Sequence, residues 1–114
     1  MRKDDLIRFL HMLDAAQEAF SFIEGKSRID LNTNRMLVLS IVKDVEIIGE
    51  AAAKISQETI TQLPQIPWSK IIGMRNRLIH AYFEVDLDVL WKTVIEDIPS
   101  LIEELEKVVP SEEI

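Results

Sequence analysis

The residues best suited to chemistry lie close together in one short segment. Arg75 is followed after four residues by His80, and Tyr82 stands two positions further on. No acidic residue occurs between Glu58 and Glu84, although the chain carries 20 acidic residues against 13 lysines and arginines. A short cationic segment in an acidic chain favours a local anion-binding site over a general nucleic-acid surface.

Arg75 and His80 together permit acid–base chemistry on an anion. A histidine transfers protons near neutral pH, and an arginine stabilises developing negative charge. RNA cleavage without a metal uses the 2′-hydroxyl as an internal nucleophile and benefits from both a base and an acid. Because one chain offers one well-placed histidine, we expect a two-fold homodimer with two copies of His80 at one cleft. The structural alternative is a helix end with a dipole-favoured histidine and a snorkelling arginine.

Other catalytic classes lack the residues they need. The sequence has no cysteine, two histidines and three separate glycines. Thiol chemistry is therefore excluded, and the sequence shows neither a cluster of metal ligands nor a glycine-rich phosphate loop. We expect no metal site and no cofactor.

The chemical residues need a helix to position them, and we predict one over residues 67–80. Arg75 falls inside its apolar arc and must be paired or reach an opening. Glu50, on a preceding helix, is a candidate partner that would hold the guanidinium; its alternative role is a solvated pair with Lys54. Gly73 leaves one side of the helix flat for a close approach by backbone or ligand.

Arg75 and His80 diverge by about 140° on an ideal helix. They converge on one phosphate only if the helix unwinds near His80, or if Arg75 reaches round or acts across a subunit boundary.

Apolar residues at helical spacing predict an all-α, antiparallel up-down bundle of four or five helices. The predicted helices cover residues 3–24, about 33–56, 67–80 and 86–109, with a loop over residues 57–66. Pro99 predicts a kink, or two collinear helices of which Asp97 caps the second. A second apolar strip on the first helix is either half of a wide buried face or an interface; it comprises Met12, Ala15, Ala19 and Phe22.

Length and charge bound the remaining possibilities. We expect one domain over residues 1–114, with an acidic tail over about 110–114. The formal net charge of −7 argues against a protein that coats nucleic acid indiscriminately. No apolar run approaches the ~20 residues of a membrane helix, and Asp4 and Asp5 stand where a signal peptide would be apolar. We therefore expect a cytoplasmic protein that does not engage a membrane.

The run of residues 75–82, Arg-Asn-Arg-Leu-Ile-His-Ala-Tyr, resembles the R-x4-H-x-Y signature of HEPN-domain proteins of the HepT type. Four other segments resemble the same family in the same order: residues 46–52, 67–68, 72–74 and 85–91. The resemblance covers roughly residues 4–109. It implies the all-α HEPN fold and a metal-independent endoribonuclease toxin, with Arg75 and His80 catalytic at a homodimer cleft.

The resemblance also implies partners and further roles. Asn76 matches a polar position beside the arginine and is expected, with Arg77, to position the RNA substrate. A cognate MNT-type nucleotidyltransferase would be the antitoxin of a type VII-like pair and would transfer AMP to Tyr82. The alternative for Tyr82 is an aromatic residue packed at a helix end. The alternative for the whole chain is a non-catalytic helical module that binds a nucleotide or docks on a nucleotidyltransferase.

Overall fold

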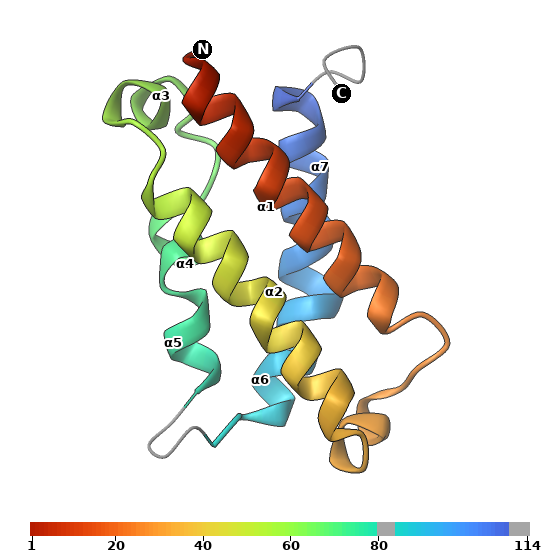
Figure 1. Ribbon diagram of the computed structural model, residues 1–114. Coiled ribbons are helices and arrows are strands. Elements are labelled where there is room, and N and C mark those ends of the chain that lie inside the picture. Colours follow the sequence, from red (N-terminus) through yellow and green to blue (C-terminus); the bar gives the residue numbers. More distant parts are fainter. Residues whose placement is uncertain (80–83, 110–114) are drawn as a thin grey trace.

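A computed structural model describes residues 1–79 and 84–109, and its elements are helical throughout. In chain order they are α1 (Lys3–Phe22), η1 (Arg28–Asn32), α2 (Arg35–Ala53), α3 (Gln57–Gln62), α4 (Trp68–Ile72), α5 (Met74–Leu78), α6 (Leu87–Lys92), η3 (Thr93–Asp97) and α7 (Ile98–Val108). The long helices α1 and α2 lie side by side, α7 packs against α1, and α4 and α5 pack against α2 (Figure 1). The predicted all-α bundle is confirmed.

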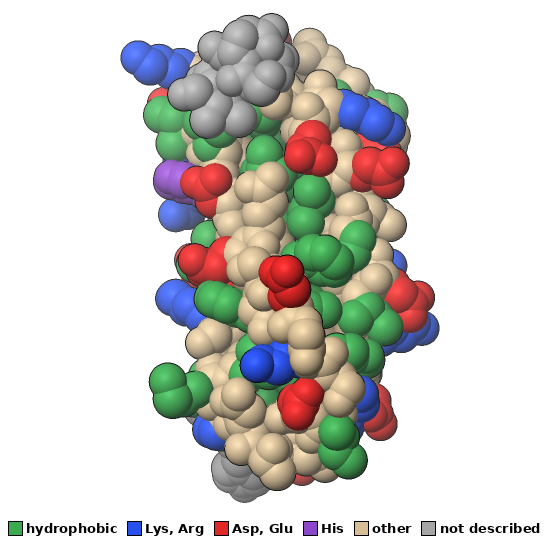
Figure 2. All heavy atoms as spheres, turned by 90° about the vertical axis from the view of Figure 1, so that its right-hand side faces the viewer, with side chains coloured by type: hydrophobic (Ala, Val, Ile, Leu, Met, Phe, Trp, Pro, Cys, Tyr) green, Lys and Arg blue, Asp and Glu red, His purple; other side chains and the backbone are tan. Residues whose placement is uncertain are grey.

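The core is formed by the apolar stripes of the long helices. Phe9, Leu13 and Ala16 of α1 are buried, as are Ile41 and Ile48 of α2. Burying such side chains supplies the main favourable term in folding, roughly 25 cal/mol per Å² of apolar surface. On the face of the molecule in Figure 2, hydrophobic side chains also reach the surface between charged ones of both signs.

The second apolar strip of α1 belongs to this core. Met12, Ala15 and Ala19 are each at most 5% exposed, and Phe22 packs against the core from a half-buried position. A wide buried face is therefore the correct interpretation, and the interface alternative is wrong. Phe20, near the end of α1, is 44% exposed.

Polar side chains fix where the helices begin. The Asn34 side chain accepts a hydrogen bond from the backbone N–H of Leu37, and the Asp86 side chain accepts one from Val89. These bonds satisfy donors that the first turn of a helix leaves free.

The segment 57–66 is not a simple loop, because it contains α3. The Ser56 side chain accepts a hydrogen bond from the N–H of Thr59 and so caps this short helix. Pro64 and Pro67 confine the loop to the residues after α3.

The last helix is interrupted before Pro99 in an unexpected way. One π-helical turn, η3, joins α6 to α7, and the Asp97 side chain makes no capping hydrogen bond. Proline lacks an N–H group and its ring crowds the carbonyl four residues earlier, a conflict that a wider turn relieves. The predicted interruption is present, but the predicted cap at Asp97 is wrong.

The described part of the chain measures 42 × 30 × 20 Å along its principal axes. Within residues 1–79 and 84–109, no helix is long and apolar enough to span a bilayer.

Candidate active site

Trp68 anchors the segment that carries the candidate residues. Its indole Nε1 donates a hydrogen bond of 3.0 Å to the carbonyl oxygen of Leu63, and its ring meets Phe9 of α1 edge-on at a centroid distance of 5.9 Å. Ile71, Met74 and Leu78 then bury their side chains in the core. The polar positions of α4 and α5 are thereby fixed relative to α2.

Gly49 of α2 faces the end of α4. A Cβ atom at this position would lie 3.5 Å from the carbonyl oxygens of both Ile71 and Ile72. A Cβ at Gly73 would meet only Ser69 and Arg77 of its own segment, so no other described element contacts this glycine. Close approach of a ligand or a second copy to Gly73 stays a prediction.

The predicted single helix over residues 67–80 is two short helices, separated at Gly73 and ending at Leu78. The Leu78 carbonyl accepts a hydrogen bond of 2.8 Å from the N–H of Asp86, and Ile79 is extended and forms an antiparallel bridge with Val85. These bonds replace further helical pairing. The helix thus ends at Leu78, two residues before the predicted end at His80.

Arg75 lies at the rim of a cavity between α2 and α5. Its Nε lies 4.0 Å from Glu46 Oε1, and the side chains of Arg75 and Glu46 are 39% and 30% exposed. Glu50, the expected partner of Arg75, lines the same cavity, but the ion pair is made with Glu46 one helical turn earlier. The guanidinium is therefore held by a carboxylate while part of it still faces solvent.

The cavity at Arg75 has a volume of about 260 Å³ and gathers several predicted site residues. Asn76 and Glu50 line it with Arg75, whereas Arg77 does not. Arg77 follows Asn76 in α5, and its side chain is exposed. His80 and Tyr82 lie outside the described residues. Ile79 is extended, so the chain leaves the helical path before the position of His80, which is one of the three predicted routes to convergence with Arg75.

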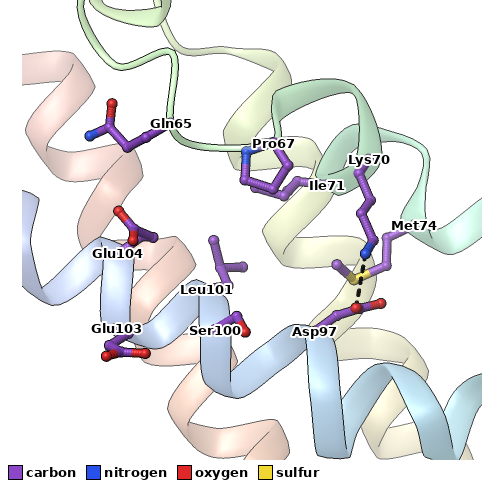
Figure 3. A pocket seen from close by; sticks show the side chains of 10 residues that line it. All are labelled: Gln65, Pro67, Lys70, Ile71, Met74, Asp97, Ser100, Leu101, Glu103 and Glu104. Carbon is purple, nitrogen blue, oxygen red and sulfur yellow. Dashed lines mark hydrogen bonds and ion pairs between the residues drawn. The ribbon is translucent and has the colours of Figure 1, made fainter.

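A second cavity, of about 350 Å³, separates α4 from α7 (Figure 3). Lys70 Nζ donates a hydrogen bond of 3.0 Å to Asp97 Oδ1 across it. Ile71, Met74 and Leu101 form apolar walls, but none of the predicted catalytic or substrate-positioning residues lines this cavity. The Lys70–Asp97 pair thus ties the motif segment to the end of η3.

Two buried carboxyl groups escaped the sequence analysis. Asp5 is 3% exposed and accepts hydrogen bonds from the Ser56 N–H, the Ser56 hydroxyl and the Thr59 hydroxyl. Burial alone would raise the pKa of Asp5, but these hydrogen bonds, with the charge of Arg2, lower it below its ordinary value. The site links the beginning of α1 to the beginning of α3.

Asp44 is the second of these carboxyl groups and is 2% exposed. Burial and the neighbouring Glu18 carboxyl group raise the pKa of Asp44 to about 7. The Oδ2 atom of Asp44 is buried and has no hydrogen-bonding partner. The spacing of Asp44 from Ile41 and Ile48 places it on the buried face of α2, and this spacing could have predicted its burial from the sequence.

Comparison with known proteins identifies the family. A family model described as "Ribonuclease HepT-like" matches residues 12–108. "Probable ribonuclease HepT" of Thermococcus cleftensis is 42% identical over 99 residues, which are 83% of this chain and 90% of that protein. "Putative RNase MJ1380" of Methanocaldococcus jannaschii is 36% identical over 107 residues, 93% of this chain and 98% of that protein. No solved structure gives a significant match. The chain belongs to the HepT-like ribonuclease family.

Proposed function

We propose that this protein is an endoribonuclease that cleaves RNA without a metal ion. The observation that carries the proposal is the placement of Arg75. A guanidinium on an otherwise buried helix face is held at a cavity rim by Glu46, 4.0 Å away, and remains 39% exposed. The helix ends at Leu78, so His80 follows a chain that has already left the helical path. Family membership adds independent support.

The proposed reaction is an internal transesterification. His80 takes the proton of a 2′-hydroxyl, and the 2′-oxygen attacks the adjacent phosphorus. The bond to the 5′-oxygen breaks, and this oxygen receives a proton from a second acid, leaving a 2′,3′-cyclic phosphate and a 5′-hydroxyl. Arg75 stabilises the negative charge on the phosphoryl oxygens during this step. Asn76, on the same cavity, and the exposed Arg77 position the substrate.

A homodimer would provide the second acid, because each subunit contributes one His80. Ile72 is 42% exposed and lines the cavity beside Arg75, which offers an apolar contact to a second copy. Light scattering at micromolar concentration should therefore give twice the 13.1 kDa mass of one chain. A mass of one chain would contradict the dimer and, with it, paired acid–base catalysis.

We further propose that an MNT-type nucleotidyltransferase silences this ribonuclease, as the antitoxin of a toxin–antitoxin pair, by transferring AMP to Tyr82. The added phosphodiester would place negative charge two residues from His80 in the sequence and compete with RNA for the same cations. Tyr82 is the only tyrosine in the chain.

Co-expression with a nucleotidyltransferase encoded beside this chain tests the control step. Mass spectrometry should detect one or more added AMP groups and locate them at Tyr82. Tyr82→Phe keeps the aromatic ring and removes the acceptor oxygen, so this variant should stay toxic in the presence of the antitoxin. Neutralisation of Tyr82→Phe as complete as that of the wild type would show that the antitoxin acts by binding alone.

A further inference from the structure

A third cavity lies between α1 and α2, next to the one that holds Arg75. It has a volume of about 230 Å³ and is lined by Arg8, His11, Ile47, Glu50, Ala51 and Lys54. Glu50 lines both this cavity and the cavity at Arg75. The two cavities are therefore neighbours on either side of the Glu50 side chain.

The charges at this cavity are unbalanced and unpaired. Arg8 and Lys54 bring two full positive charges and His11 an imidazole, against the single carboxylate of Glu50. Neither cation has an acidic side chain within 4.0 Å in the described part of the chain. The cavity therefore carries a net positive charge in a protein with an excess of acidic residues.

The Arg8 guanidinium provides a second, independent observation. Its Nε is buried and has no hydrogen-bonding partner; among the described residues, Asp44 Oδ2 is the only other such side-chain atom. Native proteins keep few unsatisfied buried donors, so the position of the Arg8 side chain calls for an explanation. An arginine that lines a cavity is suited to an anion with several acceptor oxygens.

We propose that the cavity of Arg8, His11 and Lys54 binds a phosphate group, and that this group is a backbone phosphate of the RNA away from the cleaved bond. The planar guanidinium fork matches phosphate oxygens in pairs, and the ammonium group adds a point charge. The second part of the proposal rests on the proposed ribonuclease function. The Glu50 carboxylate repels phosphate from the ridge of α2, so the cations on its two sides hold separate phosphates of one strand.

Salt-dependent RNA binding tests this subsite. A labelled single-stranded RNA is bound to the His80→Ala protein, which suppresses cleavage, and affinity is measured by fluorescence anisotropy at several salt concentrations. Arg8→Gln and Lys54→Gln should each weaken binding about tenfold and flatten the plot of log affinity against log salt by about 0.7, as expected for one lost contact to a single strand. Lys92→Gln is the matched control, because Lys92 is an exposed cation that lines neither cavity.

Lys54 is exposed, so Lys54→Glu should fold normally and give the sharper result even if the Arg8 variant unfolds. Unchanged affinity and salt slope in Lys54→Glu would overturn the RNA subsite. The outcome is independent of catalysis: RNA binding that depends on Arg8 and Lys54 would support the subsite even if the wild type cleaved no RNA. Normal cleavage with binding unaffected by both substitutions would refute the subsite alone.

A second experiment distinguishes an RNA phosphate from free phosphate as the ligand of this cavity. In the His80→Ala protein His11 is the only histidine, and its imidazole signals can be followed by NMR during titration with inorganic phosphate against chloride of equal ionic strength. We expect phosphate to shift these signals and Lys54→Glu to abolish the shift. A shift combined with RNA affinity that is insensitive to Lys54 would assign the site to free phosphate or a mononucleotide and overturn the RNA assignment. No shift at all would refute phosphate binding.

Discussion

Replacing Asp44 with asparagine should change how the stability of the protein depends on pH. Asp44 is buried beside Glu18, and its pKa is raised from 3.8 to about 7. A raised pKa means that the folded state prefers the protonated carboxyl group. The stabilisation is therefore complete below pH 3.8 and is lost as the pH rises through about 7. An asparagine cannot ionise, so at this buried position it stays uncharged at every pH.

The shift in the pKa of Asp44 gives the size of the effect. A change from 3.8 to about 7 is about three units, which corresponds to about 4 kcal/mol of unfolding free energy. This is an upper limit, because the pKa of Asp44 depends on its coupling to a neighbouring group as well as on its burial. Asp44→Asn should thus be more stable than the wild type at pH 8, by up to about 4 kcal/mol, and similar to it at about pH 4.

Urea denaturation at a series of pH values between about 4 and 8 measures this directly. The difference between variant and wild type should grow steadily with pH. Asp14→Asn is the matched control, because Asp14 lines the same cavity as Asp44 and Glu18 but is exposed. Parallel stability curves for Asp44→Asn and the wild type across this range would refute a raised pKa at Asp44.

Three further substitutions test other parts of the structure. Asp5→Ala should lower the unfolding free energy by roughly 2–4 kcal/mol, because it leaves the Ser56 and Thr59 donors unsatisfied, whereas Asp4→Ala at the exposed neighbouring position should change it little. Because the pKa of Asp5 is lowered, its contribution to stability is present above pH 3.8 and is lost as the pH falls through the pKa of the folded state. Acid titration of the wild type and of Asp5→Asn would check this pH dependence. Gly49→Ala should be tolerated, because its Cβ would be in ordinary contact at 3.5 Å, while Gly49→Leu should push α4 away and reduce both the melting temperature and RNA cleavage. Glu46→Gln should reduce kcat for RNA cleavage, because it weakens the ion pair with Arg75. It should change the unfolding free energy by less than about 1 kcal/mol, because that ion pair is partly exposed. An unchanged kcat would show that Glu46 does not position Arg75.

The fold could be predicted wherever one face of a helix is strongly apolar. The stripes of Ile41 and Ile48, and of Phe9 and Leu13, indicate two long packed helices, and their burial is confirmed. Caps at Asn34 and Asp86 were recognisable because their side chains bond to local backbone donors. Such signals are local in sequence, and the sequence therefore contains them.

Features that depend on distant contacts could not be predicted. The motif helix ends at Leu78 because its carbonyl meets the N–H of Asp86 and Ile79 pairs with Val85. The choice of Glu46 over Glu50 as the partner of Arg75 depends on how α5 crosses α2, since both carboxylates lie on the same cavity. The helix α3 depends in part on Asp5, which bonds to Ser56 although the two residues are 51 positions apart in the sequence.

The central claim is that Arg75 and His80 carry out RNA cleavage without a metal ion. The most direct measurement is cleavage of a single-stranded RNA by the purified wild type, Arg75→Ala and His80→Ala proteins in the presence of a metal chelator. We predict cleavage by the wild type with 2′,3′-cyclic phosphate and 5′-hydroxyl ends, and a loss of at least about 100-fold in each variant. Equal cleavage by all three proteins, or wild-type activity that the chelator abolishes, would contradict the claim.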